Sequence, residues 1–246
     1  MIEHVYRRAA RARSVDAVVV ATDDERIAKA VERFGGIARM TSAAHRTGTD
    51  RIAEIARELS CDVVVNVQGD LPLVEPDMIA QVVEPLLSDP TVRMSTVYRR
   101  VTTMAEYMSP HVVKVVVDRT GHSLYFSRAP IPSGPPEGGP PDTREISAAR
   151  VVGAAVRRPV FKHIGMYGYR RDFLLTFAAL PRTPLEEAES LEQLRALEHG
   201  FRIRAVETHF ESIEIDTPED LARVRQLVTD RAGTPATNFQ HEHKTR

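Results

Sequence analysis

A short apolar strand that ends in a polar, glycine-containing turn constrains the fold and the chemistry of this chain more than any other segment. Residues 62–67 form a nearly continuous β-branched run, and Gln68, Gly69 and Asp70 follow it at once. Such runs are typical of strands buried on both faces of a parallel sheet, where ligands bind at the carboxyl ends of the strands. Asp70 is therefore a candidate ligand for a divalent cation on a phosphate, with Gly69 allowing close approach. The alternative is that Asp70 only caps the turn.

The order of the predicted elements favours an α/β protein with a doubly wound, mostly parallel sheet flanked by helices. Apolar periodicity and helix end signals predict a regular alternation over the first part of the chain. In order, we expect a helix within 1–13, a strand at 15–21, a helix at 24–34, a strand at 37–40, a helix at 51–59, a strand at 62–67, a helix at 77–87 and a strand at 92–97.

The second half of the chain is predicted to begin with a β-hairpin, formed by strands 112–118 and 123–127 around the turn at Gly121. Residues 130–141 are rich in Pro and Gly, and we expect them to be poorly ordered together with 142–156. A strand at 162–169, helices at 171–179 and 186–199, a strand at 203–208 and a helix at 218–228 follow. The polar tail 229–246 predicts disorder, which leaves 1–228 as a single domain.

Composition excludes several classes of function. The 246 residues are 42% hydrophobic and 27% charged with a formal net charge of -1, so no basic surface for nucleic acid is expected. No apolar run approaches the ~18 residues that a membrane span requires. Cys61 is the one cysteine, which suits a reducing cytosol. The chain also lacks a Walker A sequence, a Cys/His metal cluster and a Gly-x-Ser-x-Gly motif.

A second carboxylate, Asp216, follows an apolar-rich segment in the way that Asp70 follows the central strand. If the sheet brings Asp70 and Asp216 together, their oxygens form a hard site for Mg²⁺ bridging phosphates. The alternative role of Asp216 is to cap the helix that begins at Pro218.

Three further polar segments are candidates for binding. The loop 45–51 places Gly48 and two threonines before a helix, where backbone N–H groups suit an anion or a base edge; an ordinary strand-to-helix loop is the alternative. Alternation in strand 162–170 places His163, Tyr167 and Tyr169 on one face, as a polar substrate surface or as core. Arg128 follows a strand, and its guanidinium can bind a carboxylate with two hydrogen bonds or lie at a solvated edge.

Nine blocks of the chain, taken together and in order, resemble one family. They are Ala21-Thr22-Asp23, His45 with Gly48-Thr49-Asp50-Arg51, Val65-Asn66-Val67-Gln68-Gly69-Asp70 with Pro72, Val113-Lys114-Val115-Val116, Tyr125-Phe126-Ser127-Arg128-Ala129 with Ile131-Pro132, Lys162-His163-Ile164-Gly165 with Tyr167-Gly168-Tyr169, Pro184-Leu185-Glu186, Leu191-Glu192-Gln193-Leu194-Arg195, and Asp216-Thr217-Pro218-Glu219-Asp220-Leu221. The chain resembles the 3-deoxy-manno-octulosonate (Kdo) cytidylyltransferases from residue 1 to about residue 228.

The resemblance implies a Rossmann-like nucleotidyltransferase fold with a smaller β-hairpin subregion for dimerisation. It also implies a Mg²⁺-dependent reaction of CTP with Kdo in a cytoplasmic homodimer that serves lipopolysaccharide-type glycan synthesis. The residues it assigns are Asp70 and Asp216 to magnesium and catalysis, Thr49, Arg51 and Gln68 to the nucleotide, and Arg128, His163, Tyr167, Glu192 and Gln193 to the sugar acid.

The chain departs from the family's pattern in three places. Residues 1–5 match the helix that follows the family's first strand and triphosphate-binding loop, so we expect an open slot beside the strands at 15–21 and 63–67. An upstream translation start explains this better than a truncated chain of weak activity, since the retained strands carry no scatter of polar residues. Leu71 replaces a polar or acidic residue, and the segment 133–159 is long.

Two other functions remain as alternatives. One is a cytidylyltransferase for another acidic sugar, such as a sialic acid or an amino-Kdo. The other is a non-catalytic dimer partner.

Overall fold

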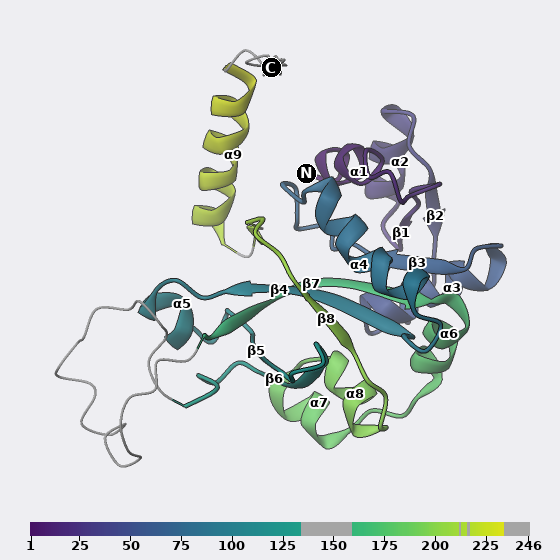
Figure 1. Ribbon diagram of the computed structural model, residues 1–246. Coiled ribbons are helices and arrows are strands. Elements are labelled where there is room, and N and C mark those ends of the chain that lie inside the picture. The colour runs from purple at the N-terminus through teal and green to yellow at the C-terminus, as the bar shows by residue number, and fades with distance from the viewer. Residues whose placement is uncertain (134–158, 212, 216, 234–246) are drawn as a thin grey trace, which may run out of the picture.

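The computed structural model describes residues 1–133, 159–211, 213–215 and 217–233 as a mixed sheet flanked by helices (Figure 1). The first half contains α1 (Ile2–Ala9), β1 (Val20–Thr22), α2 (Glu25–Arg33), β2 (Ala38–Met40), α3 (Gly48–Glu58), β3 (Val63–Asn66), α4 (Pro76–Ser88) and β4 (Met94–Arg100). The second half contains α5 (Met104–Met108), β5 (Lys114–Val117), β6 (Ser123–Ser127), β7 (Phe161–Arg170), α6 (Arg171–Ala179), α7 (Pro184–Glu189), α8 (Gln193–Glu198), β8 (Arg204–Glu207) and α9 (Pro218–Gly233).

The α/β class is confirmed, but the pairing of the strands differs from the mostly parallel sheet that alternation predicts. Strand β7 lies between β3 and β4 and runs antiparallel to both. Strand β8 runs parallel to β4, so β3, β4 and β8 do share one direction. The predicted hairpin is present as β5 and β6, and β5 joins the large sheet by pairing antiparallel with β7. The shared direction of β3, β4 and β8 agrees with the predicted alternation of strands and helices. The insertion of β7 changes which of these strands are neighbours.

The sheet is interrupted between β1 and β3, in agreement with the expected slot. Strands β1 and β2 form a separate two-stranded parallel sheet, whereas β3 belongs to the six-stranded sheet through β7. Among the strands that the structure describes, β1 and β3 therefore each pair along one edge.

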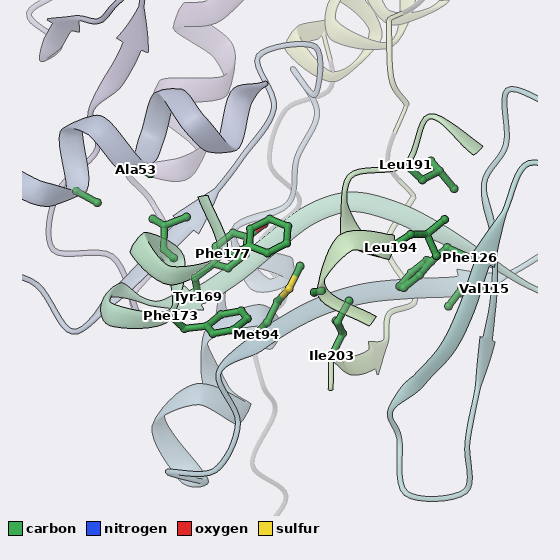
Figure 2. Close-up of a cluster of buried hydrophobic side chains, with 13 residues drawn as sticks. Ala53, Met94, Val115, Phe126, Tyr169, Phe173, Phe177, Leu191, Leu194 and Ile203 are labelled. Atoms are coloured by element: carbon green, nitrogen blue, oxygen red, sulfur yellow. The ribbon is translucent and has the colours of Figure 1, made fainter. Parts of the chain in front are cut away.

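Two apolar clusters hold helices against the two faces of the large sheet. Figure 2 shows one of them, in which Phe173 and Phe177 of α6 and Leu194 of α8 pack with Tyr169 of β7 and Phe126 of β6. The other joins Met78 and Val82 of α4 to alternate residues of β7, Ile164 and Met166. Alternating side chains of β7 thus belong to different clusters, as the period of two requires.

Leu71, the residue that departs from the family's pattern, belongs to the cluster under α4 and is fully buried. It follows Asp70 directly, and its amide donates a hydrogen bond to the carbonyl of Gln68 at 3.3 Å. An apolar residue here therefore anchors the turn after β3 in the core.

Five details of the predicted elements are corrected. The strand expected at 15–21 is shorter, since β1 covers only Val20–Thr22. The helix expected at 186–199 is two helices, because Ser190 adopts a left-handed conformation with φ 53° after α7. Helix α3 begins at Gly48, earlier than expected, and α5 was not predicted. Helix α9 continues to Gly233, beyond the predicted end of this helix at residue 228. Most of the segment expected to be poorly ordered, residues 134–156 of 130–156, lies outside the described residues, and so does the final tail 234–246.

None of the helices in the described part of the chain combines the length and the apolar character that a membrane crossing needs.

Candidate active site

The carboxyl end of β3 meets the loop that begins α3. Thr47 caps α3, since its hydroxyl accepts a hydrogen bond from the amide of Asp50 at 3.1 Å. The next residue, Gly48, lies so close to the Gln68 side chain that an added Cβ would be 3.8 Å from its Oε1. The Gln68 side chain therefore lies beside the N-terminus of α3.

The segment that precedes residue 216 reaches the same place. The amide of Ile215 donates a hydrogen bond of 3.1 Å to the carbonyl oxygen of Asp70. This contact brings the chain before Asp216 to Asp70, although position 216 itself lies outside the described residues. The Glu214 carboxylate of this segment lies against β7, since its Oε1 is 3.6 Å from the position that a Cβ would take at Gly165.

Glu192 joins the nucleotide side of the predicted site to the sugar side. Its Oε1 accepts a hydrogen bond from the Thr47 hydroxyl at 2.9 Å, and its Oε2 accepts one from Thr49 at 2.8 Å. Burial raises the pKa of the Glu192 carboxyl, and the two hydroxyl donors act in the opposite direction. Thr49 and Glu192 were assigned to different substrates from sequence, and here they are in direct contact.

Arg51 points toward the small sheet. Its Nη1 donates to the Thr41 hydroxyl at 2.6 Å, and its Nη2 contacts a carboxylate oxygen of Asp23 at 3.0 Å. Asp23 and Arg51, which lie in two separate blocks of the sequence, therefore form one ion pair between the end of β1 and α3.

The three rings predicted to share one face of β7 lie in a row. His163 and Tyr167 have ring centroids 5.2 Å apart, and Tyr167 and Tyr169 are 6.1 Å apart. Burial raises the pKa of the Tyr167 hydroxyl well above its usual value, with smaller contributions from Tyr169 and from the carboxylates of Glu192 and Glu214. The row thus begins at His163, whose ring meets that of Phe126 edge-on with centroids 5.0 Å apart, and ends at Tyr169, close to Thr49 and Glu192.

Arg128 lies at the break between α7 and α8, where the backbone holds its guanidinium. Its Nε donates to the carbonyl of Glu189 at 3.0 Å, and its Nη1 donates to that of Pro110 at 3.1 Å. The Glu189 carboxylate accepts from the Ser127 hydroxyl at 2.6 Å and from the Arg128 amide at 2.9 Å. Glu189 was not expected, since no motif indicates that a residue 61 positions away supports Arg128.

Lys114 also contacts Arg128, through the backbone carbonyl of that residue. Lys114 belongs to one of the nine blocks, where no role was predicted for it. It is fully buried, and its ammonium donates to three backbone carbonyls, those of Val112 and Arg128 at 2.6 Å and of Ser109 at 2.8 Å. An apolar strand pattern gives no sign of a buried lysine, so only the fold identifies its role.

A buried ion pair supports the helix that carries Gln193. Arg195 donates to the two carboxylate oxygens of Glu186 at 2.5 and 2.8 Å, and its guanidinium lies 5.2 Å from the ring centroid of Phe177. Gln193 is 4% exposed, and its amide nitrogen has no hydrogen-bond partner among the described residues. Gln193 is thus buried beside Glu192 with an unused donor.

The mixed α/β sheet, the polar end of β3 beside a helix N-terminus and the approach of Ile215 to Asp70 together define an α/β nucleotidyltransferase. The cytidylyltransferase family model matches residues 1–228. The chain belongs to the family of 3-deoxy-manno-octulosonate cytidylyltransferases, because relatives of that name are about half identical to it over nearly its whole length.

Two relatives and one solved structure illustrate the similarity. The 3-deoxy-manno-octulosonate cytidylyltransferase of Pelobacter propionicus is 53% identical over 226 residues, which cover 92% of this chain and 86% of the relative. The protein of that name in Geobacter metallireducens is 52% identical over 91% of this chain and 85% of its own. A solved CMP:2-keto-3-deoxy-manno-octonic acid synthetase complexed with CTP superimposes with a TM-score of 0.80 at 37% identity, over 94% of this chain and 88% of that one.

Proposed function

We propose that this protein activates Kdo by transferring a cytidylyl group from CTP, with release of diphosphate. The observation that carries the proposal is the 53% identity over 92% of the chain to a relative named for this reaction. The similar solved structure was complexed with CTP, which supports CTP as the nucleotide.

The residues of the site divide between the two substrates. We assign Thr49, Arg51 and Gln68 to the nucleotide, since they surround the N-terminus of α3, and Arg128, His163, Tyr167, Glu192 and Gln193 to the sugar acid. The contact of Glu192 with Thr49 supports a site in which the two substrates are adjacent. Adjacent binding is what a direct transfer requires, because orientation of the two reactants provides much of the rate enhancement.

The donor set at the end of β3 fits a magnesium ion. Mg²⁺ prefers oxygen ligands, keeps several waters and binds through one or two carboxylates plus substrate phosphates. The hydrogen bond from Ile215 to Asp70 supports such a pair, Asp70 with Asp216. The described residues hold no group of three metal-binding side chains, which a site completed by phosphate and water does not need. When bound, Mg²⁺ would neutralise charge on the α-phosphate.

The residues of the chain position the reactants rather than form a covalent intermediate. The anomeric hydroxyl of the sugar acid attacks the α-phosphorus of CTP, the new P–O bond forms as the bond to diphosphate breaks, and the hydroxyl proton is released. Phosphoryl transfer depends mainly on alignment and charge stabilisation. Arg128 would hold the sugar carboxylate, and Gln68 would hold the nucleotide.

We further propose that the enzyme works as a cytoplasmic homodimer in lipopolysaccharide-type glycan synthesis. These properties rest on the family resemblance and not on a feature of the described residues.

Diphosphate release with CTP and Mg²⁺ tests the proposal against its rivals. Kdo, a sialic acid and an amino-Kdo are offered separately, each with CTP and with UTP. We expect the highest kcat/KM with Kdo and CTP. A higher value with another sugar would assign the enzyme to that sugar. No release with any sugar, from a folded protein that binds a full-length relative, would favour the non-catalytic partner.

A further inference from the structure

Thr96 of β4 makes two hydrogen bonds that together determine which nitrogen of His163 carries a proton. The Thr96 Oγ1 lies 2.8 Å from the carbonyl oxygen of Met166 and 2.8 Å from Nε2 of His163. A carbonyl oxygen can only accept, so the single hydroxyl proton of Thr96 is donated to Met166. Thr96 must therefore accept the hydrogen bond from His163, which places the proton on Nε2.

A β-bulge produces this arrangement. Thr96 is opposite Tyr167 in the β4–β7 ladder, but the next residue, Val97, is opposite Ile164. The bulge therefore contains Gly165 and Met166, and it turns the Met166 carbonyl toward Thr96. Because Thr96 is fully buried, water does not compete for its hydroxyl.

The surroundings of the His163 ring determine what its unprotonated nitrogen can bind. Phe126 contacts the imidazole edge-on, and Tyr167 lies 5.2 Å from it on the sugar side of the proposed site. Burial lowers the pKa of His163 to about 3, so the ring is neutral near pH 7. A neutral imidazole with its proton on Nε2 offers Nδ1 as an acceptor. The described residues provide no hydrogen-bond partner for Nδ1.

We propose that Thr96 is a positioning residue that holds His163 as the Nε2–H tautomer, so that Nδ1 accepts a hydrogen bond from a hydroxyl of the bound sugar acid. The inference rests on the proposed function and adds to it the chemistry of one contact. A lone pair on Nδ1 attracts a hydroxyl donor and repels a carboxylate. His163 therefore selects for a hydroxyl, while the carboxylate of the same substrate binds elsewhere.

The tautomer can be measured without turnover. In protein with ¹⁵N-labelled histidine, long-range ¹H–¹⁵N spectra separate protonated from unprotonated ring nitrogens, and His163→Gln identifies the signals of His163 among the 9 histidines. We expect wild-type protein and Thr96→Ser to show a proton on Nε2, and Thr96→Val to show exchange between tautomers. A proton on Nδ1 in the wild type, or a Thr96→Val spectrum equal to that of the wild type, would overturn the proposal. The wild-type spectrum alone tests which nitrogen of His163 carries the proton, even if Thr96→Val does not fold.

Steady-state kinetics and titration test the contact with substrate. In Thr96→Val we expect KM for Kdo to rise about tenfold, which corresponds to ~1.4 kcal/mol, with KM for CTP unchanged and with recovery in Thr96→Ser. Addition of Kdo and CTP to wild-type protein should shift the His163 Nδ1 signal. Equal effects on both KM values, or an unmoved Nδ1 signal, would refute the hydroxyl contact. If wild-type protein did not turn over Kdo, the proposed function and this contact would both fail, while the spectrum would still establish the tautomer.

Discussion

The hydroxyl of Thr49 donates a hydrogen bond of 2.8 Å to Oε2 of Glu192, a residue 143 positions further along the chain. Thr47 donates to the other carboxylate oxygen, so two hydrogen bonds join the N-terminus of α3 to the N-terminus of α8. In the proposed function these two segments bind different substrates. The contact thus fixes the separation of the two binding regions.

Glu192→Gln should weaken this tie, because the amide retains one acceptor oxygen and replaces the other with a donor. We expect a loss of about 1 kcal/mol in the free energy of unfolding, together with higher KM values for both CTP and Kdo. Urea denaturation and initial rates measure the two effects. Glu187→Gln, at an exposed position of α7, is the matched control and should change neither. Wild-type stability and KM values in Glu192→Gln would show that the tie has no energetic role.

Glu186→Ala should be among the most destabilising substitutions in α7 and α8. It removes both hydrogen bonds of the Arg195 guanidinium to Glu186 and leaves this side chain, which is 3% exposed, with the longer 3.8 Å contact to Glu192. Breaking a buried pair in this way costs about 3–5 kcal/mol. Arg7→Ala breaks the exposed pair of Arg7 with Glu3 and should cost less than about 1 kcal/mol. Similar losses for the two variants would mean that the buried pair contributes no more than a surface one.

Asp70→Asn should abolish turnover while the fold is retained. The substitution preserves size and leaves the backbone carbonyl that Ile215 contacts, but it removes the negative charge proposed to bind Mg²⁺. Diphosphate release over a range of Mg²⁺ concentrations is the measurement, with circular dichroism to check folding. Asp16→Asn, at an exposed position, serves as the control. Turnover at the wild-type rate in Asp70→Asn would remove Asp70 from the metal site.

Arg128→Lys should raise KM for Kdo more than KM for CTP. The guanidinium reaches the carbonyls of Glu189 and Pro110 through two different nitrogens, and a lysine ammonium cannot reproduce that planar geometry. We expect about a tenfold increase in KM for Kdo, equal to ~1.4 kcal/mol. An increase confined to CTP would assign Arg128 to the nucleotide.

His163 should make the protein less stable in acid. Its pKa falls from 6.5 to about 3 on folding, so between those values the unfolded chain binds more protons than the folded one. The free energy of unfolding therefore rises with pH through this window and falls as the medium is acidified. The slope from this residue is at most about 1.4 kcal/mol per pH unit.

His163→Gln lacks that titration. Urea denaturation of wild type and variant, at pH values near 4.5 and 7, should give a stability difference that shifts in favour of the variant at the lower pH. A difference that is the same at both pH values would contradict the depressed pKa.

The sequence by itself determined the local elements and the chemistry at their ends. The β-branched run before Gln68 predicts β3, and a capping threonine before the glycine loop predicts a helix start, because both signals depend on residues a few positions apart. The nine blocks were also sufficient for the family. The sequence likewise predicted that His163, Tyr167 and Tyr169 share a face, since the bulge in β7 adds two residues and so preserves the alternation.

Tertiary structure decided which of these pieces touch. Apolar periodicity does not specify strand neighbours, so the insertion of β7 between β3 and β4 could not be predicted from it. The break at Ser190 depends on one left-handed residue within a pattern that otherwise favours a continuous helix. The contacts of Thr49 with Glu192 and of Thr96 with His163 join residues 143 and 67 positions apart. Hydrogen bonds between such distant residues form only when packing brings their elements together, and no local sequence signal records them.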